Sequence, residues 1–209
     1  MLYTLLWRPE ACFSTLFNKF TAKITGGEFC HSELVFQLTK KEWTSILSSY
    51  SNGKIGQRAE SLSKRLKEIF DKADDEHNIS LCFYTIWSSE MNLRLLSPTD
   101  SYIFNRLPDK RYTSTIESKF NYEEQRAALG FCLSELHKKY DNVKAVLFWM
   151  PRCNRQTNAL PTKYFCSEFI VYCLQQVGYA KHCRPENITP NDLPKILNEV
   201  NDTLDKRVR

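Results

Sequence analysis

The chain contains few of the residues that mark linkers and flexible tails. Among its 209 residues, six are glycine and eight are proline, and no segment is of low complexity. Thirteen phenylalanines and ten tyrosines supply ample material for a core, and this length is sufficient for one globular unit. We therefore expect a single domain over residues 1–209.

Long apolar runs are also missing. No segment approaches the ~20 apolar residues that a membrane-spanning helix needs, so no transmembrane segment is expected. The apolar start Met1–Trp7 is followed by Arg8-Pro9 and has neither a basic leader nor a small-residue cleavage site. It is a poor signal peptide and a good first strand. The expected location is the cytoplasm.

Zinc-binding motifs are missing despite eight cysteines. No Cys-x-x-Cys pair occurs, and most cysteines stand in apolar runs, as Cys82 and Cys132 do. Buried free thiols behave as small hydrophobes, and a chain without a secretion signal is expected in a reducing compartment. Cys30-His31 and His182-Cys183 could supply ligands, but neighbouring residues of a strand point to opposite faces. No metal and no cofactor are expected.

No block of like charge is present either. The net charge is +5 and is spread along the chain, apart from a short basic run at Lys206, Arg207 and Arg209. Segments that bind nucleic acid usually carry blocks of about five or six like charges. The run is interpreted as a solvated tail, and nucleic acid is not an expected partner.

Hydrophobic periodicity predicts helices and strands that do not alternate regularly. Helices are expected at 11–24, 58–72, 121–140, 165–177 and from about 194, and Asn121 with Glu124 predicts a capping box for the third of them. Loops are expected at 48–56, 97–120 and 151–161, and strands at 1–7, 29–36, 79–87, 92–96 and 143–149. This pattern favours an α+β fold in which helices pack on a largely antiparallel sheet.

Histidine is scarce, which limits the candidates for a catalytic base to His31, His77, His137 and His182. Only His31 stands in an apolar strand, where an imidazole can be held and desolvated as a general base. A core histidine bonded to its neighbours is the alternative. Glu33 lies on the same strand face and could orient the imidazole and stabilise its charge, or could instead pair with a surface lysine.

Cys166 is the candidate nucleophile because it opens a predicted helix. The helix dipole and the free amides of the first turn favour a thiolate, and those amides can also bind an acyl oxyanion. Spacing alone favours a packing role, since Cys166, Ile170, Cys173 and Val177 form one apolar stripe. Ser167 is a weaker candidate, because no Gly-x-Ser-x-Gly motif surrounds it.

Four segments carry a family resemblance when taken in order. They are Phe29–Val35 (FCHSELV), Lys139-Tyr140-Asp141 followed by the apolar run 145–148, Tyr164–Phe169 (YFCSEF), and Gly178 followed by 188–193 (ITPNDL). Together they resemble the permuted branch of the NlpC/P60 papain-like superfamily, which includes YiiX-type hydrolases and poxviral relatives. The similarity covers about residues 1–197 with a poorly matched middle at 39–120, and His31 precedes Cys166 by 135 residues, as the permuted order requires.

The resemblance implies a papain-like fold in which a sheet carrying His31 packs against a helix carrying Cys166. It also implies a Cys–His pair completed by Glu33, although relatives may take the third residue from the next strand. Tyr140 and Asp141 are expected to be structural or to line the wall of the site.

The implied activity is hydrolysis of an amide, ester or thioester, in a peptide or an acyl lipid, through an acyl-enzyme. A lipid substrate would bring peripheral contact with a membrane. Three alternatives stay open at this point: acyl transfer, a catalytically inactive papain-like binding protein, and a virion or scaffold protein. The oligomeric state is not predicted.

Overall fold

The fold combines an antiparallel sheet with helices, as the α+β prediction requires. The computed structural model describes residues 1–9, 16–50, 52–72, 78–85, 91–96, 113–141 and 160–207. In chain order the elements are β1 (Leu2–Trp7), α1 (Leu16–Ile24), β2 (His31–Thr39), α2 (Lys40–Ser49), α3 (Gly53–Lys72), β3 (Asn78–Tyr84), β4 (Asn92–Leu96), β5 (Thr113–Ser118), α5 (Tyr122–Glu135), β6 (Lys139–Tyr140), β7 (Lys163–Tyr164), α7 (Cys166–Gln176), a short 3-10 helix (Pro185–Asn187) and α8 (Leu193–Arg207).

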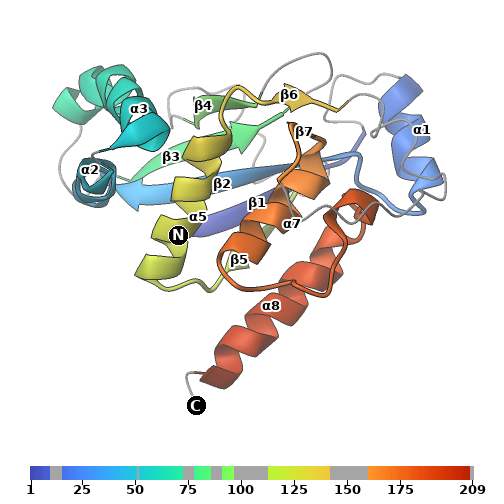
Figure 1. The fold of residues 1–209 in the computed structure, drawn as a ribbon. Helices are drawn as coiled ribbons and strands as arrows, with labels where there is room; N and C mark the ends of the chain where they lie inside the picture. The colour runs from blue at the N-terminus through green and yellow to red at the C-terminus, as the bar shows by residue number, and fades with distance from the viewer. Residues whose placement is uncertain are drawn as a thin grey trace.

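Five strands form the main sheet in the order β4-β3-β2-β1-β5, and each neighbouring pair is antiparallel. Figure 1 shows α5 and α7 lying across one face of this sheet, with α2 and α3 at the end toward which β2 runs. A separate two-stranded ladder pairs β6 with β7 in parallel. β2 is therefore a central strand, paired on both edges.

Side chains on β2 alternate between two apolar layers. Leu34, Phe36 and Leu38 belong to the main core, which also includes the buried faces of α5, α7 and α8. The residues between them face the other side of the sheet, where Leu5 and Cys82 help to form a smaller buried cluster. The candidate base at the start of β2 thus belongs to a strand that is covered on both faces.

The predicted start of α5 is confirmed. The Asn121 side chain accepts a hydrogen bond from the backbone N–H of Glu124 at 2.9 Å, and the Glu124 carboxylate accepts one from the backbone N–H of Asn121 at 3.0 Å. A second capping box, formed by Thr39 and Glu42, begins α2. Such boxes satisfy amides that the helix itself leaves unpaired.

Three loop or helix predictions are wrong in part. The loop expected at 48–56 is mostly helical, because α2 continues to Ser49 and α3 begins at Gly53. Strand β5 occupies 113–118 within the segment expected to be irregular. The helix expected to reach residue 140 ends at Glu135, since His137 takes a φ of 69° and its backbone N–H bonds to the carbonyl of Met91 at 3.0 Å. Tyr140 lies in β6 instead.

Other boundaries agree with the sequence pattern to within a few residues. α1 ends at Ile24, just before Gly26 with its φ of 70°, and α7 ends at Gln176, just before Gly178 with its φ of 95°. The expected residues 11–15 of the first helix, the strand at 143–149 and most of the loop at 151–161 lie outside the described residues. Within the described parts of the chain, no helix is long and apolar enough to cross a membrane.

Candidate active site

His31 and Glu33 lie together at the start of β2, as their spacing predicts. The distance from His31 Nε2 to Glu33 Oε1 is 3.3 Å, and the two side chains are 15% and 3% exposed. The contact is close enough for an ion pair but lacks the alignment of a strong hydrogen bond. Trp7 stands directly opposite His31 in the ladder with β1 and is itself buried. The imidazole is therefore largely shielded from water.

Cys166 is the first residue of α7 and is 5% exposed. Phe165 precedes the helix in an extended conformation, and its backbone N–H donates to the Glu168 carboxylate at 3.3 Å. The thiol consequently sits at the positive end of an 11-residue helix. α7 packs against β2, so the helix that bears Cys166 and the strand that bears His31 are in contact.

The pKa values of the two side chains move toward an ion pair. Burial alone would lower the pKa of His31, but the neighbouring Cys166 and Glu33 overcome it and raise the pKa to about 10. Burial alone would raise the pKa of the Cys166 thiol, but His31, with a smaller contribution from Ser32, lowers it below its ordinary value. Each charge is stable in this buried place because the other is next to it.

Ser32 is a site residue that the sequence did not reveal. Its hydroxyl and its backbone N–H both interact with Cys166 and lower the pKa of the thiol. The residue is 2% exposed, and among the described residues its buried hydroxyl has no partner in good hydrogen-bond geometry. The sequence does not mark Ser32 as a site residue, because the alternation of a strand places it on the face opposite to His31 and Glu33.

Asn191 connects the closing turn to the strand of the base. Its Oδ1 accepts from the backbone N–H of Phe29 at 2.8 Å, and its Nδ2 donates to the carbonyl of Phe29 at 2.9 Å and to the hydroxyl of Thr25. Gly27 permits this approach, since a Cβ there would lie 2.3 Å from the Asn191 side chain. The turn thus holds the chain just before His31.

Tyr140 lies beside the nucleophile because β6 and β7 pair. The register joins Tyr140 to Tyr164, and the backbone N–H of Asp141 donates to the carbonyl of Tyr164 at 2.8 Å. Burial raises the pKa of Tyr140 well above its ordinary value, and the nearby Cys166 raises it further. The phenol accordingly keeps its proton beside the sulfur of Cys166.

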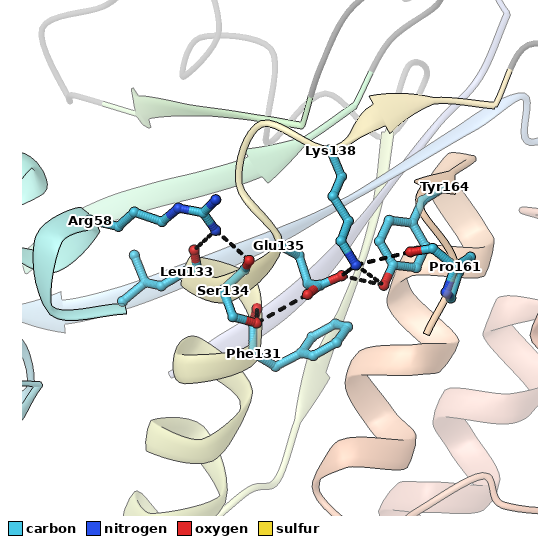
Figure 2. A network of polar contacts seen from close by, with 8 residues as sticks. All are labelled: Arg58, Phe131, Leu133, Ser134, Glu135, Lys138, Pro161 and Tyr164. Atoms are coloured by element: carbon cyan, nitrogen blue, oxygen red, sulfur yellow. Dashed lines mark hydrogen bonds and ion pairs between the residues drawn. The ribbon is translucent and has the colours of Figure 1, made fainter. Parts of the chain in front are cut away.

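A polar network holds the segment that leads to the nucleophile (Figure 2). Glu135, at the end of α5, accepts from the Tyr164 hydroxyl and forms an ion pair with Lys138. The Lys138 ammonium also donates to the carbonyl of Pro161 at 2.9 Å. Ser134 donates to the other oxygen of Glu135 at 3.2 Å. Tyr164, two residues before Cys166, is fixed in this way to the helix α5.

Two of the other histidines are exposed. His182 is exposed and lies 3.7 Å from Glu199, His137 is exposed beyond the end of α5, and His77 falls outside the described residues. In the described ranges of the chain, no group of three or more histidine, cysteine or acidic side chains is arranged to hold a metal ion.

An open groove among the described residues lies away from this site. It has a volume of about 540 Å³ and is lined by Tyr50, Ile55, Glu123, Arg126, Ala127, Gly130, Phe131, Ser134, Leu160 and Gln176. Gln176 ends α7 whereas Cys166 begins it, a separation of about 15 Å along the helix axis. The groove does not include the thiol or the imidazole.

Comparison with known proteins identifies no relative: no family model, curated protein or solved structure matches this chain. The resemblance to the permuted NlpC/P60 branch consequently stays a prediction. The function is therefore inferred from the geometry of His31, Glu33 and Cys166.

Proposed function

We propose that the chain is a cysteine-nucleophile hydrolase of the permuted papain-like kind, with Cys166 as nucleophile, His31 as acid and base, and Glu33 as the residue that orients His31. One observation carries this proposal. A thiol at the start of a helix lies against an imidazole whose Nε2 is 3.3 Å from a buried carboxylate. Nucleophile, base and orienting group are the three parts that such catalysis needs.

The reaction follows from the charges of the pair. The Cys166 thiolate attacks a carbonyl carbon, and the carbonyl electrons move to its oxygen, where amides of the first turn of α7 can stabilise the oxyanion. The oxyanion collapses, His31 gives its proton to the leaving amine, alcohol or thiol, and a thioester remains on Cys166. Neutral His31 then takes a proton from water, the hydroxide attacks the thioester, and the acid and the thiolate separate.

The substrate belongs to the acyl compounds, either peptides or acyl lipids. The scheme applies equally to amides, esters and thioesters. The supporting features are the order of the motifs, in which His31 precedes Cys166, and the α+β sheet packed by α7. A cytoplasmic location and contact with a membrane surface by way of a lipid substrate belong to the same proposal.

A catalytically inactive binding protein is the second candidate, and one observation favours it. Cys166 is only 5% exposed, which a packing role also predicts. The two candidates differ in whether an acyl group can reach the sulfur.

Trapping of the acyl-enzyme tests the proposal directly. Wild-type protein is mixed with p-nitrophenyl acetate and p-nitrophenyl octanoate and then examined by intact-mass and peptide mass spectrometry. We expect a rapid release of p-nitrophenol and an acyl group on Cys166. Cys166→Ser should show neither, while Cys183→Ser, which alters a more exposed thiol, should behave as wild type. Acylation at Cys183 alone, or none without denaturant, contradicts the proposal and favours the binding protein.

A further inference from the structure

Cys82 makes a polar contact with the candidate site from the neighbouring strand. Its thiol donates to Glu33 Oε2 at 3.3 Å. In the register of β2 and β3, Cys82 is paired with Val35, so it lies on the same face of the sheet as Glu33. Cys82 has no exposed surface, and Glu33 is 3% exposed. The contact is buried, and the proposed reaction does not use this thiol.

The two oxygens of Glu33 thereby have different neighbours. Oε1 lies 3.3 Å from His31 Nε2, while Oε2 accepts from Cys82. The terminal torsion of a glutamate is broad and is not fixed by staggering. A donor on Oε2 therefore restricts the rotation of the carboxylate and keeps Oε1 directed at the imidazole.

The apolar surroundings of Cys82 increase the stabilising effect of its hydrogen bond on the Glu33 carboxylate. Leu5, Trp7 and Val35 form the apolar cluster in which Cys82 lies. A carboxylate buried among apolar side chains needs hydrogen bonds to stay ionised. An aliphatic residue of similar volume would fill the space beside Glu33 without supplying a proton. A thiol does both.

We propose that Cys82 is a positioning residue, which holds the Glu33 carboxylate in the orientation that engages His31. This inference rests on the proposed function, because it gives Glu33 a role in the pairing of His31 with Cys166. The alternative is that Cys82 is only a small hydrophobe that fills the core. The two roles predict different results when the Cys82 thiol is replaced by an apolar side chain of similar volume, which cannot donate a hydrogen bond to Glu33.

Substitutions at Cys82 separate the two roles. Cys82→Ser keeps a donor, Cys82→Ala removes it and leaves a small space, and Cys82→Val removes it and keeps an apolar side chain. Cys132→Ala is the matched control, since Cys132 is also completely buried but contacts Cys173 in the main core. It creates a similar space without touching Glu33.

Two measurements are made on each variant. The first is the pH dependence of alkylation of Cys166 by iodoacetamide. The second is the titration of the His31 ring by NMR, which needs no catalytic activity. Since Glu33 raises the pKa of His31, a less well held carboxylate should lower the His31 midpoint. For the loss of one hydrogen bond we expect this midpoint to decrease by about 0.4 to 1 pH unit.

The proposal predicts this decrease for Cys82→Ala and Cys82→Val, a midpoint within about 0.3 unit of wild type in Cys82→Ser, and an unchanged midpoint in Cys132→Ala. Identical His31 titrations in wild type, Cys82→Ala and Cys82→Val overturn it, as does an equal shift in Cys132→Ala. If wild-type Cys166 has no reactivity in the native state, the proposed function fails. The His31 titration then still decides whether Cys82 acts on Glu33.

Discussion

At the scale of single residues, the site depends on two charges that burial opposes. An imidazolium and a thiolate are each disfavoured in a desolvated place, and they become favourable only as a pair. In the proposed ion pair, His31 and Cys166 together carry one proton, which is on the imidazole. The unfolded chain also carries one proton on these groups at neutral pH, on the thiol. Folding therefore moves a proton between them without net uptake.

The stabilisation from this pair should have a maximum in pH. Below the ordinary His pKa of 6.5, the unfolded chain binds a proton that the folded pair does not gain, so stability decreases as the pH decreases. Above the ordinary Cys pKa of 9.0, the unfolded thiol loses its proton while His31 keeps its own up to about 10, so stability decreases as the pH increases.

Urea denaturation of wild type and Cys166→Ser between about pH 5 and 10 measures this effect. The difference in free energy of unfolding should favour wild type most between the two ordinary pKa values, 6.5 and 9.0. A difference that stays constant over the whole range means that the pair does not exist in the folded protein.

Glu33→Gln should weaken the pairing of His31 with Cys166 while keeping a side chain of the same size at residue 33. The Glu33 carboxylate contributes to the raised pKa of His31, and an amide of the same shape carries no charge. The midpoint of the His31 titration, followed by NMR, should therefore decrease from its wild-type value of about 10. Glu117→Gln, at an exposed position on β5, is the control. Equal His31 midpoints in the two variants remove Glu33 from the site.

The residues that could be predicted are those whose chemistry is unusual for their place in the sequence. A histidine in an apolar strand and a carboxylate two residues later depart from a simple packing pattern, whereas Cys166 fits an apolar stripe and was singled out only by its place at the start of a helix. Ser32 and Cys82 gave no such signal, because each fits its strand as an ordinary small residue. Their contacts arise from the pairing of β2 with β3 and from the placement of α7, which the sequence pattern does not specify.

At the scale of elements, the closing turn and the α1–β2 connection form one unit. Asn191 bonds to both sides of the Gly27 position, at Thr25 and Phe29. Since a Cβ at residue 27 would be 2.3 Å from Asn191, the two residues should be energetically coupled.

A double-mutant cycle measures this coupling. Gly27→Ala should destabilise the protein by about 1–3 kcal/mol, because the new methyl group displaces Asn191. The same substitution should cost much less when Asn191→Ala is already present. Additive effects of the two substitutions on the free energy of unfolding show that Gly27 and Asn191 do not meet.

The network at the end of α5 makes a second prediction at this scale. Tyr164→Phe removes a hydroxyl donor from Glu135, which is only 4% exposed, and should lower the free energy of unfolding by about 1–3 kcal/mol. Tyr172→Phe, which alters the tyrosine whose ring packs on Tyr164, should cost less. Chemical denaturation compares the two, and a larger loss in Tyr172→Phe contradicts the network.

Elements with strong local signals could be predicted, and those defined by partners could not. The start of α5 has a capping box, and α7 is followed by Gly178 with positive φ, so both were found from sequence. β5 was missed because its residues Thr113–Ser118 are largely polar, and only pairing with β1 makes them a strand. The early end of α5 depends on a bond between His137 and Met91, two residues that are distant in the chain.

At the scale of the whole molecule, the helices and the sheet share one main core. Cys132 on α5 and Cys173 on α7 both belong to it, and their sulfurs are 4.0 Å apart. Neither thiol can meet a reagent unless the core opens. Burial also raises the pKa of Cys132 well above its ordinary value, which makes the folded thiol even less reactive.

Alkylation in increasing urea should therefore separate two kinds of cysteine. Cys132 and Cys173 should react only by way of unfolding, with a common dependence on urea concentration. Cys166 should react in the native state and show little dependence on urea below the transition. Site-resolved mass spectrometry distinguishes them. If Cys166 follows the same dependence as Cys132, it is a core residue like the others.

The most direct test of the central claim is the pH profile of Cys166 alkylation in wild type and His31→Ala. Since the pair lowers the pKa of Cys166, wild-type Cys166 should react with iodoacetamide below pH ~7, well under the ordinary thiol range, and faster than the other seven cysteines. His31→Ala should abolish this advantage. Retained low-pH reactivity without His31, or no native-state reactivity in wild type, would contradict the thiolate–imidazole pair and with it the proposed hydrolase.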